Sequence, residues 1–313
     1  MKFYRNLIIL SIVLLALITT YILVPKKNET GKDLNVSGSK ITVKTFKTED
    51  MKEISIKNSS GTIVLTKVAQ DWKMTNPTDF KLDTISVTSF VKNIRNFKAM
   101  DIINKKPSDL TVYGLKTPNA ILTVRTKNGV STHFKLGGQL PTGNGYYLMT
   151  SDGLVVYSIS DFAAGDILRT SAEFRDKTVF AFNKKDVSFV SISKQGKVLF
   201  KFKRNAAGWD VIADTTKAGD SKKIENVIDK LSSLKVKEFI NPLSYVKENV
   251  IGESNSYTIA IGIDKQPELR LIVGEDKDEG SIYVEREGPK EVFAVYKGDV
   301  DFVRSNMNDF IKK

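Results

Sequence analysis

Few residues in this sequence have side chains that could carry out chemistry. The chain contains no cysteine and one histidine, His133. The lack of cysteine excludes a disulfide framework, a thiolate zinc site and a cysteine nucleophile. A serine–histidine–acid triad would have to use His133, yet no Gly-x-Ser-x-Gly motif is present to hold the serine. His133 alternates with the apolar Phe134 and Leu136, so we predict that it lies on the solvent side of a strand.

An acidic segment near the C-terminus matches part of a calcium-binding loop. Asp276, Asp278 and Glu287 take the first, third and twelfth places of such a loop. The glycine that the loop requires at its sixth place is replaced by Ser281. We therefore predict an acidic hairpin tip, and we expect no metal site and no cofactor.

A glycine-rich patch is the other segment that invites a chemical interpretation. Gly137-Gly138 and Gly143–Gly145 lead into the strand-like residues 146–149, whereas a phosphate loop leads into a helix. The patch is thus predicted to be a hairpin connection. Paired carboxylates for glycoside hydrolysis are defined by their separation in space, and no motif indicates such a pair. We expect a protein that is not an enzyme.

The N-terminal residues predict attachment to a membrane. Residues 7–24 carry no charge, and as a helix they would span about 27 Å, close to the thickness of a bilayer's hydrocarbon core. A cleaved signal peptide is the alternative, but Leu23-Val24-Pro25 is not a small-x-small cleavage site. We predict that residues 1–25 are an uncleaved transmembrane anchor that contacts membrane lipid through residues 7–24. The polar residues 26–42 are predicted to be a flexible stalk.

The anchor also predicts a location. A short N-terminal tail usually stays inside the cell, and no second apolar run of membrane length follows the first. We therefore expect a single-pass protein of the cell membrane with most of its chain outside the cytoplasm. The lack of unpaired thiols fits an oxidising compartment. A composition rich in lysine and asparagine is consistent with a bacterial protein.

A repeat at constant spacing dominates the remaining sequence. Trp72 and Trp209 lie 137 residues apart, and the apolar residues around them recur at the same offset. Upstream of the tryptophans the offset is 136. The recurring positions in the predicted helices are Val87, Phe90, Val91, Ile94 and Phe97, which correspond to Ile224, Val227, Ile228, Leu231 and Leu234. We predict a tandem duplication, with repeats at residues 43–168 and 179–313 and a connection at 169–178.

Each repeat shows the same order of predicted elements. Alternating apolar residues predict strands before and after each tryptophan, and spacing of i, i+3, i+4 and i+7 predicts one amphipathic helix. Asp83 or Thr84 can cap the first helix, and Asp220 or Ser221 the second. The predicted fold class is therefore α+β: an N-terminal transmembrane helix followed by two tandem repeats, each an antiparallel sheet with one principal helix.

The charge of the chain bears on its partners. Its net charge is +12 and its isoelectric point is about 9.5. The lysines are dispersed among acidic residues and are not gathered on one helix, so we expect no nucleic-acid binding. Attraction to an anionic envelope polymer or to lipid head groups stays open.

Several motifs resemble those of a family of bacterial membrane-anchored proteins, the domain-of-unknown-function family number four-three-four-zero. The matching segments are Trp72 followed by a helix, Tyr113–Pro118, Phe134–Gly137, Tyr146-Tyr147 and Phe174–Phe180. In the second repeat Tyr113-Gly-Leu is replaced by Val250-Ile-Gly252. Members of this family resemble companions of gliding-motility-type ABC transporter permeases. The resemblance implies an extracytoplasmic accessory subunit, and it implies no catalytic residues.

Three functions follow as hypotheses. The first is a non-catalytic extracytoplasmic accessory subunit that contacts an ABC permease. The second is a module that binds an envelope polymer or a lipid head group, with Tyr146, Tyr147 and Tyr283 as candidate surface contacts. The third is a hydrolase that uses carboxylates alone.

Overall fold

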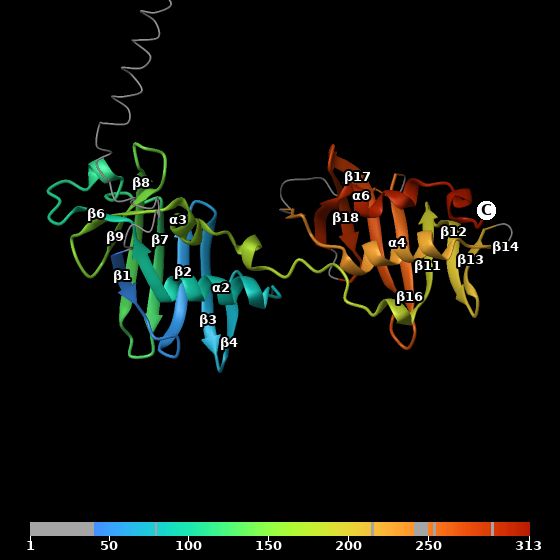
Figure 1. Cartoon of the computed structure of the whole chain (residues 1–313), viewed down its shortest axis with the longest axis horizontal. Helices are drawn as coiled ribbons and strands as arrows, with labels where there is room; N and C mark the ends of the chain where they lie inside the picture. Colours follow the sequence, from blue (N-terminus) through green and yellow to red (C-terminus); the bar gives the residue numbers. More distant parts are fainter. Residues whose placement is uncertain (1–40, 79, 214–215, 241–249, 253–254, 289–290) are drawn as a thin grey trace, which may run out of the picture. The chain divides into compact units, whose positions relative to one another are not determined.

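The computed structural model of the chain describes residues 41–78, 80–213, 216–240, 250–252, 255–288 and 291–313 (Figure 1). It is mostly β-sheet with few helices, an α+β-like fold with three antiparallel sheets. The predicted anchor and residues 26–40 of the predicted stalk lie outside the described residues. Within the described part of the chain, no helix is both long enough and apolar enough to cross a bilayer.

The first repeat contributes ten strands in two sheets. Its principal helix is α2 (Thr84–Arg95), and a shorter helix, α3 (Asp161–Leu168), follows the last strand. The short 3-10 helices of this part are η1 (Thr111–Tyr113) and η2 (Ser171–Phe174). The strands are β1 (Ile41–Thr45), β2 (Met51–Asn58), β3 (Gly61–Val68), β4 (Asp71–Asn76), β5 (Asn96–Ala99), β6 (Asp101–Asn104), β7 (Ala120–Thr126), β8 (Ser131–Gln139), β9 (Tyr146–Thr150) and β10 (Val156–Ile159).

The second repeat contributes nine described strands in one sheet. Its principal helix is α4 (Ser221–Ser233), and α6 (Lys297–Val300) follows the last strand. The 3-10 helices are η3 (Lys184–Asp186), η5 (Asp301–Arg304) and η6 (Met307–Phe310). The strands are β11 (Val187–Lys194), β12 (Lys197–Asn205), β13 (Gly208–Ile212), β14 (Thr216–Ala218), β15 (Glu238–Phe239), β16 (Tyr257–Ile263), β17 (Leu269–Asp278), β18 (Ser281–Arg286) and β19 (Glu291–Tyr296).

The two large sheets have matching strand orders. One is ordered β4-β3-β2-β7-β8-β9-β10-β6, and the other is ordered β14-β13-β12-β11-β16-β17-β18-β19-β15. Their registers also match: Ile54 lies opposite Val124 in the first sheet, and Val190 lies opposite Ile261 in the second. Residues that are 136 or 137 positions apart in the sequence thus occupy equivalent positions in the two sheets.

The sequence prediction needs two corrections in the first repeat. We expected one sheet there, but β1 and β5 form a separate two-stranded sheet. We also placed Phe97 on the principal helix, whereas it belongs to β5 and lies opposite Lys44. Phe97 is nevertheless buried, at 3% exposure, because its strand delivers the ring to Phe134, with ring centroids 4.8 Å apart.

The predicted helix stripes form core. Ile224, Val227, Ile228 and Leu231 of α4 are at most 3% exposed and belong to the core of the second repeat. The equivalent residues of α2 are also buried. Of the two predicted caps of α4, Asp220 is the one that accepts a hydrogen bond from the backbone N–H of Lys223, at 3.3 Å.

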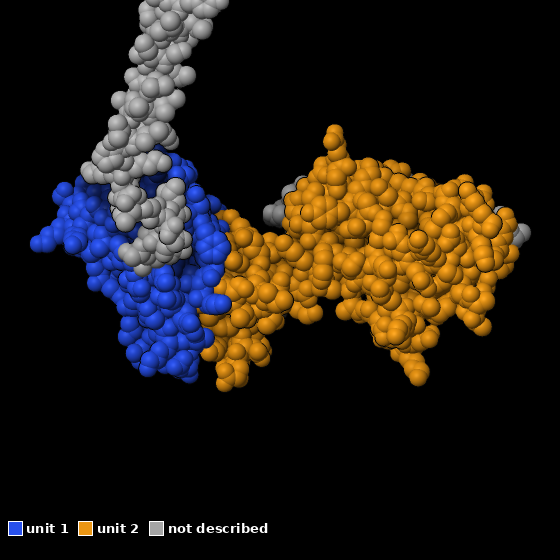
Figure 2. Space-filling model, viewed as in Figure 1, with its two compact units in different colours: residues 1–59, 92–168 blue, residues 60–91, 169–313 orange. Residues whose placement is uncertain are grey.

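The described residues divide into two compact units (Figure 2). Those within 1–59 and 92–168 form unit 1, and those within 60–91 and 169–313 form unit 2. Unit 2 includes the start of α2 because the residues before this helix pair with the chain that follows α3. Leu82 forms a β-bridge with Arg175, and the Asp83 N–H donates to the Phe174 carbonyl at 2.9 Å. These units differ from the predicted repeats, 43–168 and 179–313, which were defined by the sequence duplication. The repeat boundaries stay predictions.

Candidate functional site

Tyr147, a candidate surface contact, is held by packing inside unit 1. Its ring meets that of Tyr113 in a T-shaped arrangement with centroids 5.1 Å apart. The Tyr113 hydroxyl accepts a hydrogen bond from Asn104 Nδ2 at 3.0 Å. Both tyrosines pack against a small cluster of Leu115, Met149 and Val156. The Tyr113-Gly-Leu motif therefore covers one face of the sheet, and Tyr147 belongs to that contact.

The other two candidate tyrosines lie on different sheets. Tyr146 is half-buried on β9 opposite Ile159, and Tyr283 is half-buried on β18 opposite Ala294. Tyr146 and Tyr147 are consecutive residues of β9, so their side chains point to opposite faces of the sheet, and Tyr283 belongs to the second repeat. A role for Tyr146 and Tyr283 in surface contact stays a prediction.

His133 is hydrogen-bonded to residues of neighbouring strands. It is half-buried on β8, and its Nδ1 shares a hydrogen bond with Thr123 Oγ1, 2.9 Å away on the neighbouring strand. Its backbone N–H donates to Ser151 Oγ at 3.0 Å. A cross-strand threonine takes the place that an acid or a serine nucleophile would have in a triad.

The acidic segment of residues 275–280 is a hairpin tip, as predicted. Strands β17 and β18 meet there, and Asp278 Oδ1 accepts from the Gly280 N–H at 2.9 Å. Glu287 is 3.4 Å from Arg270 Nε, whereas Asp278 lies 3.8 Å from Lys237 Nζ. Each of these carboxylates thus lies beside a cation, although Glu287 shares Arg270 with Glu268, whose Oε1 accepts from Arg270 Nε at 2.6 Å. Within the described residues, no group of three or more acidic or histidine side chains is arranged to hold a metal ion.

Asp276 is the most strongly engaged of these carboxylates. Arg304 Nη2 donates to its Oδ1 at 2.8 Å, and Lys297 Nζ pairs with its Oδ2. The hydrogen bonds from Arg304 and Lys297 hold the pKa of Asp276 below its ordinary value. It therefore stays ionised at neutral pH and ties β17 to the C-terminal helices, a structural role.

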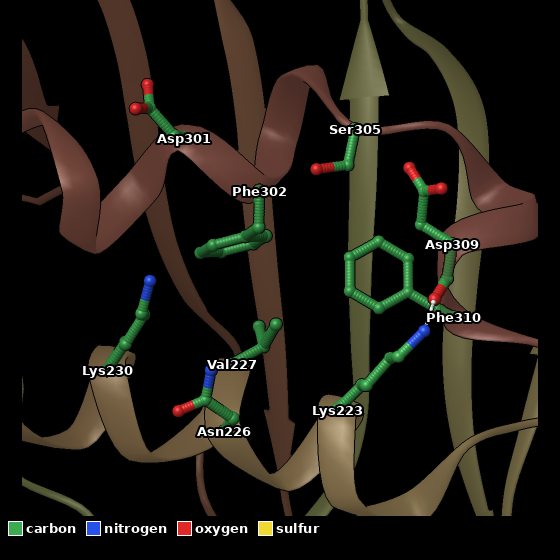
Figure 3. A pocket seen from close by; sticks show the side chains of 9 residues that line it. All are labelled: Lys223, Asn226, Val227, Lys230, Asp301, Phe302, Ser305, Asp309 and Phe310. Atoms are coloured by element: carbon green, nitrogen blue, oxygen red, sulfur yellow. Dashed lines mark hydrogen bonds between the residues drawn. The ribbon is translucent and has the colours of Figure 1, made fainter.

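A groove of about 450 Å³ runs between α4 and the C-terminal segment (Figure 3). Val227, Phe302 and Phe310 lie between the helix and that segment. Lys223 Nζ donates to the Asp309 carbonyl and Lys230 Nζ donates to the Gly298 carbonyl, each at 2.7 Å. Because both ammonium groups are bound to backbone oxygens, they hold the C-terminal segment on the helix.

A second hollow, of about 710 Å³, opens at the start of α4 and is the best candidate for a binding site. Its volume lies in the range of small-molecule sites. Four lysines and two carboxylates line it, so its walls carry a surplus of positive charge. Trp209 also lines it; this residue is 3% exposed, and its indole Nε1 has no hydrogen-bond partner among the described residues. The charged residues are Asp210, Asp220, Lys222, Lys223, Lys312 and Lys313.

Arg175 is the residue whose importance sequence reasoning missed. Its guanidinium carbon lies 3.9 Å from the centroid of the Phe80 ring and 3.6 Å from that of Phe239, so it stacks against two aromatic rings. Its Nη2 also pairs with Glu291. The side chain is only 13% exposed. In the sequence Arg175 stands out only as part of the segment Phe174–Phe180, which carries the family resemblance. That segment does not predict the contacts with Phe80, Phe239 and Glu291.

The family assignment rests on a direct match. Residues 72–255 match the model of the family described as Domain of unknown function (DUF4340). The chain belongs to this family. The DUF4340 match begins at Trp72, runs through the junction that contains Arg175, and ends in the second repeat. No curated protein and no solved structure gives a significant match to the chain.

Proposed function

We propose that this DUF4340 protein is a non-catalytic accessory subunit that is anchored in the membrane, has its two repeats outside the cytoplasm and associates with an ABC-type transporter. The uncharged residues 7–24 support the anchor. The resemblance of Tyr113–Pro118 and the other motifs to companions of ABC transporter permeases supports the transporter partner.

The ion pairs of Asp276 and Glu287 beside the β17–β18 hairpin support the non-catalytic part of this proposal. A general acid or base needs a pKa near the working pH and a free path to substrate. Asp276 instead has a lowered pKa and two cationic partners, and Glu287 faces Arg270. This arrangement fits a protein that acts through its surfaces.

Capture from native membranes tests the proposal. The full chain with a C-terminal tag would be crosslinked in membranes, solubilised in mild detergent and analysed by mass spectrometry. We expect recovery of a permease and its ATPase, and we expect both to be lost when residues 41–313 are deleted. Equal recovery with the truncated chain, or recovery of no transporter component, would contradict the proposal.

A second candidate function is binding of an anionic envelope polymer or lipid head group, favoured by the lysine-lined hollow at the start of α4. The double variant Lys222→Glu/Lys312→Glu reverses two exposed charges there. The matched control Lys52→Glu/Lys57→Glu makes the same charge change on exposed positions of β2. If this function is right, the full chain binds isolated envelope material in a salt-sensitive way, and only the first variant loses that binding.

Binding that is unchanged in the Lys222/Lys312 variant would rule out the hollow. Tyr146→Ala and Tyr283→Ala would then test the candidate tyrosines in the same assay.

A further inference from the structure

The groove between α4 and the C-terminal segment has a counterpart in the first repeat. The two places correspond through their backbone contacts. Asp83 N–H donates to the Phe174 carbonyl at 2.9 Å, and Asp220 N–H donates to the Phe310 carbonyl at 2.8 Å. Each of these aspartates also caps the helix that follows it. Phe310 therefore takes the place of Phe174, and α4 takes the place of α2.

The 3-10 helices that end in these phenylalanines correspond as well. A capping box starts η2 at Thr170 and η6 at Asn306. The residue before the cap is Arg169 in the first repeat and Ser305 in the second. A serine in the second repeat thus replaces an arginine in the first.

Arg169 occupies the space between the helix and the segment in the first repeat. Its guanidinium carbon lies 5.5 Å from the centroid of the Phe90 ring and 5.3 Å from that of Phe174. Its Nη1 donates to Ser86 Oγ at 3.2 Å, and this hydroxyl donates to the Glu173 carbonyl at 2.8 Å. The chain itself therefore fills this place with a cation.

The same place is open in the second repeat. Val227 stands at the position of Phe90, and Ser305 stands at that of Arg169. Both side chains are smaller than their counterparts. Both line the groove of about 450 Å³, together with Phe310 (Figure 3). The groove thus lies where the first repeat holds its own arginine.

A positive charge lies on the helix in the second repeat. Lys223 stands at the position of Ser86. Its Nζ donates to the Asp309 carbonyl at 2.7 Å, which is the bond that Ser86 makes to Glu173. An ammonium has three N–H donors, and among the described residues Lys223 uses one of them. A ligand group in the place of the Arg169 guanidinium therefore faces an ammonium, so it must accept hydrogen bonds and cannot be a cation.

The carboxylates of the groove restrict the charge of a ligand. Asp309 Oδ2 accepts from the Asn306 N–H at 3.0 Å, and Asp301 lies at the far end of the groove from Lys223, on the side of Lys230 (Figure 3). The two lysines and two aspartates balance in charge. A group with a single negative charge therefore fits this lining better than a phosphate does.

We propose that this groove binds a small organic carboxylate. The carboxylate lies between Lys223 and Ser305 and accepts hydrogen bonds from the ammonium and the hydroxyl. The apolar part of the molecule packs on Val227, Phe302 and Phe310. The inference goes beyond the proposed function, since it needs neither the membrane anchor nor a transporter partner.

Titration calorimetry of the full chain in detergent tests the proposal, with benzoate as the ligand and benzamide as its neutral isostere. Empty micelles give the background heat. We expect benzoate to bind at a single site, and benzamide to bind about tenfold more weakly or less because it lacks the negative charge. Equal affinities, or no binding of benzoate at millimolar concentration, would overturn the proposal.

The variant Lys223→Met removes the ammonium and keeps most of the length of the side chain. We expect the affinity for benzoate to fall to that for benzamide, and the affinity for benzamide to stay unchanged. A parallel loss of both ligands would show that Lys223 affects only the shape of the groove, and this result would overturn the proposal. The matched control Lys203→Met removes an exposed lysine of β12 outside the groove and should leave binding unchanged.

The double variant Lys223→Ser/Ser305→Arg rebuilds the arrangement of the first repeat. The guanidinium should fill the groove and abolish benzoate binding, while the unfolding midpoint measured by circular dichroism stays at or above that of the natural chain. Binding of benzoate that persists in the folded double variant would place the ligand elsewhere and overturn the proposal. Lys223→Met keeps the proposal testable if the double variant does not fold.

Discussion

The carbonyl oxygen of Tyr113 occupies the space that a side chain at Gly137 would need, since a Cβ there would lie 2.2 Å from that oxygen. The second repeat contains the same relationship 137 residues later, where a Cβ at Gly274 would lie 1.9 Å from the Val250 oxygen. Both glycines lie where the strand register shifts, between Leu136 and Gln139 and between Val273 and Asp276. The duplication therefore preserves a close backbone contact although Tyr113-Gly-Leu became Val250-Ile-Gly.

Replacing either glycine should be costly. Gly137→Ala and Gly274→Ala force a backbone segment away from the sheet, so we expect each to lower the free energy of unfolding by about 3 kcal/mol. Urea denaturation of the purified chain measures this. Gly153→Ala is the matched control, because a Cβ there meets nothing within 4 Å. Equal stability of Gly137→Ala and Gly153→Ala would contradict the close contact.

The apolar stripe of α4 gives a second prediction. Leu231 is fully buried in the core of the second repeat, so Leu231→Ala should cost about 2–5 kcal/mol through lost burial and the cavity left behind. Leu199→Ala removes the same atoms from a side chain that is 38% exposed, and it should cost much less. Thermal unfolding followed by circular dichroism compares the two. Similar losses would mean that α4 does not pack as described.

Arg175 should tolerate neither truncation nor a conservative change. Arg175→Ala leaves Glu291 without this cation and removes the stacking on Phe80 and Phe239, so we expect a loss of about 2 kcal/mol. Arg175→Lys keeps the charge but lacks the planar guanidinium, so most of that loss should remain.

The control for Arg175 is a pair on the surface. Arg125 is 53% exposed and lies 3.9 Å from Glu53, so Arg125→Lys should change the unfolding midpoint little. Full stability of Arg175→Lys would show that charge alone accounts for the Arg175 contacts.

Asp176 should make stability depend on pH in the acid range. Partial burial raises its pKa, but the hydrogen bonds from Lys81 and Thr178 outweigh this and lower the pKa to about 2 from an ordinary value of 3.8. A pKa that is lower in the folded state adds stability above pH 3.8, and that stability is lost as the pH falls toward 2. Because Lys81 is 80% exposed, we expect a contribution on the order of 1 kcal/mol.

The test for Asp176 compares urea unfolding of the natural chain and Asp176→Asn between pH 7 and pH 2. The difference between them should be constant down to about pH 4 and should shrink below it. Asp71→Asn, which removes a negative charge from an exposed position of β4, controls for net charge. A difference that persists unchanged at pH 2 would rule out ionisation of Asp176 as its source.

Much of the fold could be predicted from local pattern. The helical spacing of Ile224, Val227 and Leu231 requires one apolar face, and that face is buried in the structure. The constant offset between Trp72 and Trp209 correctly predicted two sheets of matching strand order. Asp83 and Asp220 were each one of two predicted helix caps, and they could be predicted because capping depends on neighbours in the chain.

The contacts of a candidate site could not be predicted in the same way. Arg175 meets Phe80 and Phe239, which are far from it in the sequence, and no local pattern records such a meeting. For the same reason the sequence showed Asp276 only as one residue of an acidic segment. The structure shows that Arg304 and Lys297 form ion pairs with it.

The sequence by itself therefore determined the duplication, the principal helices and most strands, because these depend on the order and periodicity of neighbouring residues. The anchor that it predicts lies outside the described residues. Tertiary structure alone decided that Phe97 belongs to a strand, that Gly137 lies against Tyr113, and that lysines gather at the start of α4. These features depend on distances between segments remote in the chain, and such distances exist only once the sheets have formed.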